Sequence, residues 1–180
     1  MTVLLYRTFT AALEVRDDGD GRTLVGLALP YGVEIDLGSY RESFAYGTAF
    51  ADLDPAQVVL TATHPRDGAE LPIGISVELA EEQDGLHGAW RVSKTQLGDE
   101  VLELARDRVP LGLSIGFIPD PAADRWTRDH TRVERRGALL DHIAVVRSGA
   151  YPGARIASLR AAHAPATPRL RLARLLRRAA

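Results

Sequence analysis

Leu111-Gly-Leu-Ser-Ile-Gly-Phe-Ile118 is an apolar run that carries one hydroxyl, that of Ser114, at its centre. Its length and composition predict a strand, and two further polar residues lie in similar surroundings. His64 ends an apolar stretch that begins at Val58, and Asp141 lies within Ala138-Leu-Leu-Asp-His-Ile-Ala-Val-Val146. A serine nucleophile needs an imidazole within hydrogen-bond reach and a third group that fixes the tautomer of that imidazole. His64, Ser114 and Asp141 are therefore candidates for base, nucleophile and orienting acid.

The rest of the chain predicts short strands and few helices. One helix is expected after Ser93, because Ser93-Lys-Thr-Gln96 has the spacing of a capping box and apolar residues then recur at helical intervals up to Pro110. A second, shorter helix is expected over residues 42–50. The fold class is therefore mainly β with few helices (α+β). Besides residues 111–118, the expected strands are 2–10, 23–30, 58–63, 72–79, 86–92 and 132–146, the last of them broken near Gly137.

Composition limits the chemistry that this chain can perform. Its 180 residues, 46% of them hydrophobic, are enough for one domain with a core. It has no cysteine, which excludes disulfides, thiolate metal ligands and cysteine nucleophiles. The histidines lack a metal-ligand spacing such as His-x-x-x-His, and the glycines do not form a phosphate-binding loop, so we expect neither a metal nor a cofactor. Without a signal peptide or a run of about 18 apolar residues, a soluble, unexported protein with no membrane partner is expected.

Charge is distributed unevenly along the chain. From His142 to the end there are eight arginines and no acidic residue, whereas residues 1–141 have a net charge of −10. A basic end of this kind either meets an acidic partner or is a solvated segment. The stretch from Pro168 onward is compatible with a basic amphipathic helix, but a helix of about 11 residues is marginal alone in water. We therefore expect residues 158–180 to form a basic, flexible tail.

Several segments, in the expected order, resemble the prohead maturation proteases of tailed bacteriophages, in the group typified by phage HK97. The most specific is Leu113-Ser-Ile-Gly-Phe117, which resembles the nucleophile strand of that family. The resemblance covers roughly residues 20–157. The other segments are Val25-Gly-Leu-Ala-Leu-Pro-Tyr-Gly32, Arg41-Glu-Ser-Phe-Ala-Tyr-Gly-Thr-Ala-Phe50, His64 followed by Pro72-Ile-Gly74, and Leu140-Asp-His-Ile-Ala-Val-Val146 through Ala150-Tyr-Pro-Gly-Ala-Arg-Ile156.

The resemblance implies a serine endopeptidase domain over residues 1–157, built as a closed β-barrel of the herpesvirus-protease type and flanked by helices. It implies that the enzyme cleaves capsid or scaffold proteins, and itself, during phage head maturation. That work takes place in the cytoplasm of the bacterial host, inside the assembling prohead. The partner would be the major capsid protein or a scaffold protein, with no specific nucleic acid and no cofactor. The herpesvirus relatives are dimers, so the resemblance allows a homodimer.

The resemblance leaves two candidates for the third member of the triad. The herpesvirus relatives use a second histidine there, which makes His142 the alternative to Asp141. Neighbouring residues of a strand face opposite sides, so only one of the two is expected to face His64. The family pattern places an acid at this position, which favours Asp141. Backbone amides of Arg147 and Ser148 are expected to meet the oxyanion, by analogy with an arginine-containing loop of the herpesvirus enzymes.

Three positions depart from the family pattern. Pro65 follows the histidine where the family has an acidic or amide residue, Ser148 begins Ser-Gly-Ala where the family has Pro-Ala, and Asp141 stands where Glu is usual. Two other functions therefore stay open. One is a capsid-assembly factor that keeps the barrel without catalysis, and the other is a small barrel that binds an apolar ligand between the strands of Trp90 and Phe117.

Overall fold

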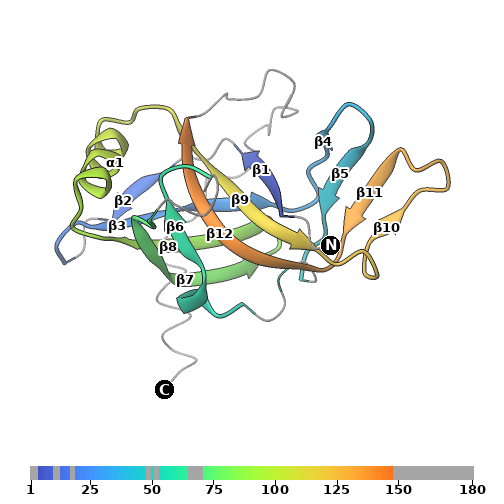
Figure 1. The fold of residues 1–180 in the computed structure, drawn as a ribbon, viewed down its shortest axis with the longest axis horizontal. Coiled ribbons are helices and arrows are strands. Elements are labelled where there is room, and N and C mark those ends of the chain that lie inside the picture. The colour runs from blue at the N-terminus through green and yellow to red at the C-terminus, as the bar shows by residue number, and fades with distance from the viewer. Residues whose placement is uncertain are drawn as a thin grey trace.

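The computed structural model describes residues 4–9, 13–16, 19–47, 50, 53–64 and 71–147, and within these ranges the chain is mainly β with one α-helix (Figure 1). No helix in these ranges is long and apolar enough to cross a membrane. The strands form two sheets. The larger contains β1 (Leu5–Phe9), β2 (Glu14–Arg16), β3 (Thr23–Pro30), β6 (Val59–Thr61), β7 (Gly74–Glu82), β8 (Gly85–Val92), β9 (Leu111–Pro119) and β12 (Ala138–Arg147). The smaller contains β4 (Ile35–Asp36), β5 (Arg41–Phe44), β10 (Arg125–Trp126) and β11 (Arg132–Arg135).

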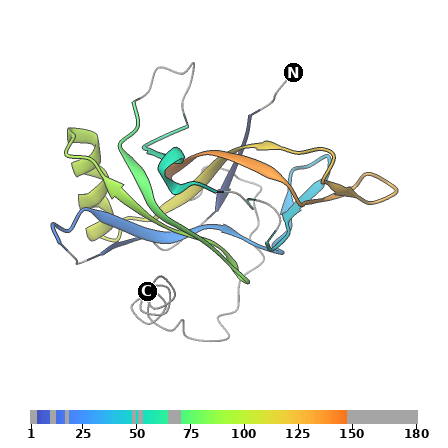
Figure 2. The same ribbon diagram turned by 90° about the horizontal axis from the view of Figure 1, so that it is seen from below.

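The larger sheet has the strand order β1-β9-β12-β6-β7-β8-β3-β2. Its pairs are antiparallel except for β12 and β6, which run parallel. The last strand of the described chain, β12, thus lies between the strand that carries Ser114 and the strand that leads to His64. Figure 2 shows the sheet strongly curled, with the helix α1 (Gln96–Arg106) and the smaller sheet at opposite ends of it.

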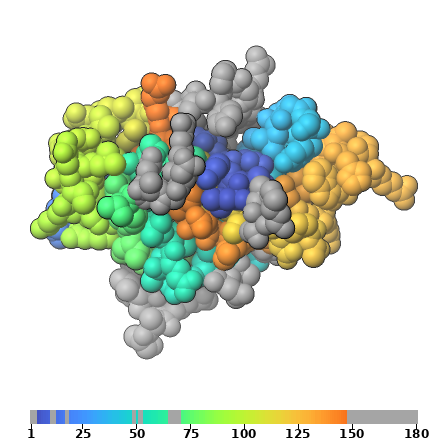
Figure 3. All heavy atoms as spheres, viewed as in Figure 1, coloured from blue at the N-terminus to red at the C-terminus, as the bar shows by residue number. Residues whose placement is uncertain are grey.

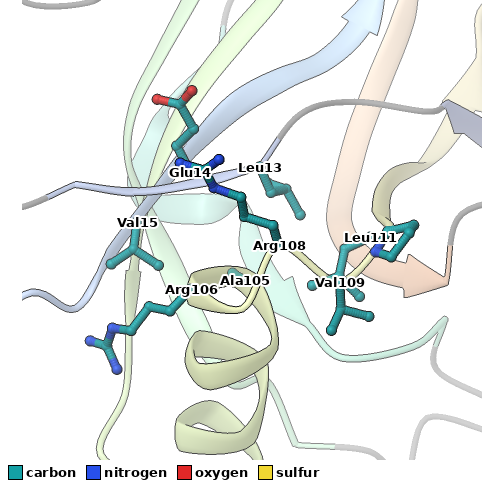
Figure 4. A pocket seen from close by; sticks show the side chains of 9 residues that line it. Leu13, Glu14, Val15, Ala105, Arg106, Arg108, Val109 and Leu111 are labelled. Carbon is teal, nitrogen blue, oxygen red and sulfur yellow. The ribbon is translucent and has the colours of Figure 1, made fainter.

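The expected closed barrel flanked by helices is wrong: the larger sheet is a curled half-barrel. Its two edge strands pair on one side each, β1 with β9 and β2 with β3. In the described strands no ladder joins β1 to β2, and α1 packs beside β2. A cleft of about 750 Å³ lies at this open side (Figure 4). Its walls come from β2, the end of α1 and the start of β9, and include Glu14, Val15, Ala105, Arg108, Val109 and Leu111.

The core fills the concave face of the larger sheet with large side chains. Trp90 and Phe117 are both fully buried, and Phe117 meets Phe44 of the smaller sheet edge to face at 5.2 Å between ring centroids. Gly88 makes room for the indole, since a Cβ at that position would lie 2.4 Å from Cζ2 of Trp90. Trp90 and Phe117 are therefore packing residues of the core, and the ligand-binding barrel suggested for them loses its basis.

The helix follows β8 as expected, but it begins later than the capping-box spacing suggested. Thr95, not Ser93, is the N-cap, and its hydroxyl accepts a hydrogen bond from the backbone N–H of Gly98 at 3.1 Å. The buried face consists of Gly98, Val101, Leu102 and Ala105. Leu97 and Leu104, two other apolar residues of this helix, are exposed.

The first residues of the segment for which a helix was expected, residues 42–50, lie in the smaller sheet. That expectation is wrong, because Arg41–Phe44 form β5, which pairs with β4 and β11. Burial alternates along this strand: Glu42 and Phe44 are buried, whereas Arg41 is exposed. A period of two is that of a strand, and the turn at Gly47, whose φ is 69°, ends the segment.

A buried ionic cluster fastens the smaller sheet to the larger one. Its centre is Glu42, whose side chain is 0% exposed and which pairs with Arg7 of β1 and with Arg135 of β11, the latter at 2.7 Å. Arg135 also pairs with Asp124. Burial raises the pKa of Asp124, and the neighbouring Arg135 opposes that rise. A buried carboxylate is stable only when cations and donors surround it, so Glu42 holds β1, β5 and β11 in one arrangement.

Removing the central charge is expected to destabilise the fold. Glu42→Gln would leave two guanidinium groups facing a neutral amide, and breaking a buried pair in this way typically costs about 3–5 kcal/mol. The free energy of unfolding from urea titration measures the loss. Glu34→Gln is the matched control, because Glu34 pairs with Arg41 and Arg132 at the surface, where a pair contributes at most about 1 kcal/mol. Equal losses for the two variants would contradict the role given to Glu42.

Candidate active site

Ser114 lies in the middle of β9, between β1 on one side and β12 on the other. Its neighbours Leu113 and Ile115 belong to the core, so strand alternation turns the Ser114 side chain to the opposite, convex face of the sheet. The serine is nevertheless fully buried, because residues on that face cover it. A hydroxyl in such a position needs partners within the protein.

His64 provides the first partner. It follows β6 after a short bend, and its Nε2 lies 2.6 Å from Oγ of Ser114. The ring of Tyr6 packs on the imidazole, with 4.1 Å between ring centroids. Burial lowers the pKa of His64 to about 4, and the nearby His142 adds to this effect. The imidazole is therefore neutral at physiological pH, so that Nε2 can accept the hydroxyl proton of the serine.

His142 occupies the position behind His64. Its Nε2 lies 2.9 Å from Nδ1 of His64, and its own Nδ1 lies 2.7 Å from Oδ2 of Asp141. His142 is 1% exposed, whereas the side chain of Asp141 is 51% exposed. The expectation that Asp141 faces His64 directly is thus not what the structure shows: it places the alternative, His142, against His64, and Asp141 one step further out.

A bulge in β12 explains why His142, and not the Asp141 that the family pattern favoured, faces His64. Leu140 lies opposite Phe117 and His142 opposite Gly116, so Asp141 is an extra residue in the ladder. Two residues of a bulged strand oppose one of its partner, which shifts the alternation by one position. Leu140 can therefore point into the core while His142 points to the convex face, and the carboxylate of Asp141 reaches the ring of its own neighbour.

Gly116 makes the space that the second imidazole fills. A Cβ at this position would lie 2.2 Å from Cε1 and 2.6 Å from Nδ1 of His142, far inside contact distance. The glycine two residues after Ser114 is therefore part of the site. In the sequence the only signal for it is the spacing Ser-x-Gly in a strand, which has no meaning until the register with β12 is known.

The four groups form one consistent line of hydrogen bonds. If Ser114 donates to Nε2 of His64, then Nδ1 of His64 carries a proton and donates to Nε2 of His142. His142 then donates from its own Nδ1 to the carboxylate of Asp141. Each ring nitrogen is either a donor or an acceptor and never both. One choice of tautomer for His64 and one for His142 therefore satisfies all three hydrogen bonds.

The first strand brings two residues to the site that the sequence did not single out. Tyr6 lies over the rings of His64 and His142, and Thr8 is opposite Ser114 in the ladder, with its hydroxyl donating to Oγ of the serine at 3.0 Å. The structure says less about Arg147 and Ser148, the two candidates for binding the oxyanion. Arg147 ends β12 with an exposed side chain, opposite Leu111, and Ser148 lies outside the described residues.

A comparison with known protein families shows which family this chain belongs to. A family profile described as caudovirus prohead serine protease matches residues 11–167. The chain belongs to this family. Among solved structures, the bacteriophage T4 capsid assembly protease, gp21, is similar in fold, with a TM-score of 0.57 and 13% identity, over 81% of this chain and 98% of that one. No curated protein sequence matches significantly.

One group of described residues outside the site could offer ligands to a cation. Glu82, Asp84 and His87 lie at the turn between β7 and β8, and their ligand atoms are within 4.8 Å of one another. Nε2 of His87 already lies 3.0 Å from Oδ1 of Asp84. Surface carboxylates often gather in this way, so the group gives no reason to revise the expectation of a reaction without a metal.

Filling the space at Gly116 is expected to disable the site while leaving the core intact. In Gly116→Ala the new methyl group displaces His142, and a misplacement of about 1 Å typically costs about 10²-fold in rate. The measurement is the rate at which a fluorophosphonate probe labels Ser114. Gly88→Ala is the control, since its methyl group strains the core at Trp90 instead, and labelling is compared at a temperature where circular dichroism shows both variants folded. Equal labelling of Gly116→Ala and wild type would contradict the packing argument.

The low pKa of His64 predicts an unusual pH dependence. A histidine with an ordinary pKa near 6.5 would lose its function as a base below that pH. Here the labelling of Ser114 is expected to stay constant as the pH falls through 6.5 and to decline only near the His64 pKa of about 4. The unfolded chain binds a proton at this residue between those two values and the folded chain does not, so the free energy of unfolding falls as the pH drops from 6.5 towards 4. A labelling midpoint at 6.5 in folded protein would refute the assignment.

Proposed function

We propose that this protein is a serine endopeptidase that cleaves capsid or scaffold proteins, and itself, inside the assembling phage head. The observation that carries the proposal is the contact of 2.6 Å between Nε2 of His64 and Oγ of Ser114, with a second imidazole behind the first. Membership of the prohead serine protease family supports the class of substrate, and the similar fold of the T4 capsid assembly protease agrees with it.

Acylation begins when Oγ of Ser114 attacks the carbonyl carbon of the substrate. His64 accepts the hydroxyl proton on Nε2 as the new bond forms, and then gives that proton to the leaving amine. The carbonyl oxygen becomes negative in the intermediate and needs preorganised donors, each of which is typically worth about 2.7–4 kcal/mol. We assign this role to the backbone amides of Arg147, the last residue of β12, and of Ser148, which lies outside the described residues.

His142 and Asp141 stabilise the imidazolium that forms during each step. The protonated His64 still donates from Nδ1 to Nε2 of His142, so the ring keeps its orientation through the reaction. Asp141 accepts from the far side of His142 and supplies the negative charge that this buried pair of rings otherwise lacks. Because its carboxylate is half exposed, Asp141 acts through His142 and not on His64 itself.

The remaining parts of the chain have roles that follow from this function. We propose that the basic segment of residues 158–180, which lies outside the described residues, either docks the enzyme on an acidic partner in the prohead or is removed by self-cleavage. The family relationship supports the major capsid protein or a scaffold protein as substrate. A homodimer, as in the herpesvirus enzymes, is compatible with the fold.

Loss of the nucleophile is expected to abolish processing. On co-expression with the capsid precursor, Ser114→Ala should leave both the precursor and the enzyme uncut, because removal of this triad member typically costs about 10⁶-fold in rate. The measurement is the mass of each chain. Ser39→Ala, which changes an exposed serine on the smaller sheet, should process like wild type. If wild type and Ser114→Ala leave the precursor equally intact, the protein is an assembly factor that lacks catalysis.

The order of the two residues behind His64 can be tested by a second pair of variants. His142→Ala removes the group that fixes the tautomer of His64 and is expected to cost about 10⁴-fold in acylation rate. Asp141→Asn keeps that contact and should cost clearly less. Fluorophosphonate labelling measures both. A larger loss for Asp141→Asn than for His142→Ala would show that the carboxylate contacts His64 directly during the reaction.

A further inference from the structure

The strand β1 lies beside the proposed nucleophile and outside the part of the chain that the family profile matches, which begins at residue 11. Among the described strands it is an edge strand that pairs only with β9, and Thr8 stands directly opposite Ser114 in that antiparallel ladder. Directly opposed residues of two strands point to the same face of a sheet. Thr8 therefore shares the convex face with the catalytic groups.

The hydroxyl of Thr8 donates a hydrogen bond to Oγ of Ser114 at 3.0 Å. The same oxygen lies 2.6 Å from Nε2 of His64, towards which it directs its own proton. A serine hydroxyl has one proton and two lone pairs, so these two bonds use the proton and one lone pair and leave the other free to attack. Thr8 thus helps to fix both the rotamer of Ser114 and the direction of its reactive lone pair.

We propose that Thr8 is a further catalytic residue, which holds Oγ of Ser114 and stabilises the charge that this oxygen carries in each step. The inference deepens the proposed protease function and rests on it. In acylation the bond between Oγ and the carbonyl carbon forms while the hydroxyl proton passes to His64, and the bond to the amine then breaks as His64 gives that proton to the leaving nitrogen. In deacylation water adds to the carbonyl carbon and gives a proton to His64, the bond to Oγ breaks, and His64 returns the proton to Oγ. Thr8 donates to Oγ in both steps. In the first step Oγ loses its proton, and in the second Oγ leaves the carbonyl carbon.

The neighbours of Thr8 hold it in place. Arg7 reaches the buried Glu42 and lies over the ring of Phe117, at 5.7 Å from the centroid, while Tyr6 packs on His64. The atoms of β1 sit on the surface next to the smaller sheet in Figure 3. Because the two residues before Thr8 anchor this edge strand on both of its faces, the hydroxyl is held in orientation before substrate arrives, which is what preorganised stabilisation requires.

The test separates the hydroxyl of Thr8 from its methyl group. Thr8→Val removes the hydroxyl and keeps the shape, Thr8→Ala removes both, and Thr8→Ser keeps the hydroxyl alone. The probes are a fluorophosphonate, which reports acylation of Ser114, and p-nitrophenyl acetate, whose burst and steady state report acylation and deacylation separately. Thr23→Val on β3 is the matched control, and melting by circular dichroism checks that each variant folds.

We expect Thr8→Val and Thr8→Ala to slow both probes by about 10- to 100-fold, which corresponds to one hydrogen bond to a charged atom. Thr8→Ser and Thr23→Val should remain within about threefold of wild type, which corresponds to a change of at most about 0.65 kcal/mol. The proposal is overturned if Thr8→Val reacts like wild type, or if Thr8→Ser is as slow as Thr8→Ala. If wild-type protein does not react at Ser114 at all, the protease function itself fails, and the inference about Thr8 with it.

Discussion

The hydrogen bond between His64 and His142 is the contact on which the site depends. It joins a residue that follows β6 to a residue of β12, and these are the two strands that pair in parallel in the larger sheet. Without it the imidazole of His64 would be a half-buried ring with no partner at Nδ1 to hold it against Ser114. The bulge at Asp141 and the missing side chain at Gly116 both serve this contact, because the first turns His142 to the convex face and the second gives it room.

Physical patterns in the sequence predict most of the larger sheet. The strand expected over residues 23–30 is β3, and those expected near residues 86–92 and 111–118 are β8 and β9, because apolar runs between turns identify strands directly. Alternation also allows a strand over residues 41–44, yet a helix was expected there. The buried Glu42 obscures the alternation of a strand, because a carboxylate is not expected at a buried position. It can be recognised as buried only when its partners, Arg7 and Arg135, are known. Those partners are distant in sequence.

In the candidate site, too, the sequence identified some residues and missed others. The residue types of a base and a nucleophile in strand surroundings directed attention to His64 and Ser114, and the structure brings these two side chains together. The order of His142 and Asp141 behind them depends on one extra residue in β12, and register is a property of two strands and not of one. Thr8 could not be identified from the sequence for the same reason, since only the pairing of β1 with β9 places it opposite Ser114. The closed barrel was wrong because the two edge strands of the larger sheet, β1 and β2, are not paired in the described residues, and pairing between distant strands is not written in either strand alone.

The position of β12 in the larger sheet also determines when, during synthesis of the chain, the candidate site can form. The strand with the serine and the strand leading to the first histidine are not neighbours; β12 separates and joins them, and it is the last strand of the described chain. A nascent polypeptide whose residues 138–147 are still inside the ribosome therefore has its nucleophile and base on unconnected strands. The contact between Ser114 and His64 can therefore form only after residues 138–147 have left the ribosome, so the growing chain lacks an assembled site until then.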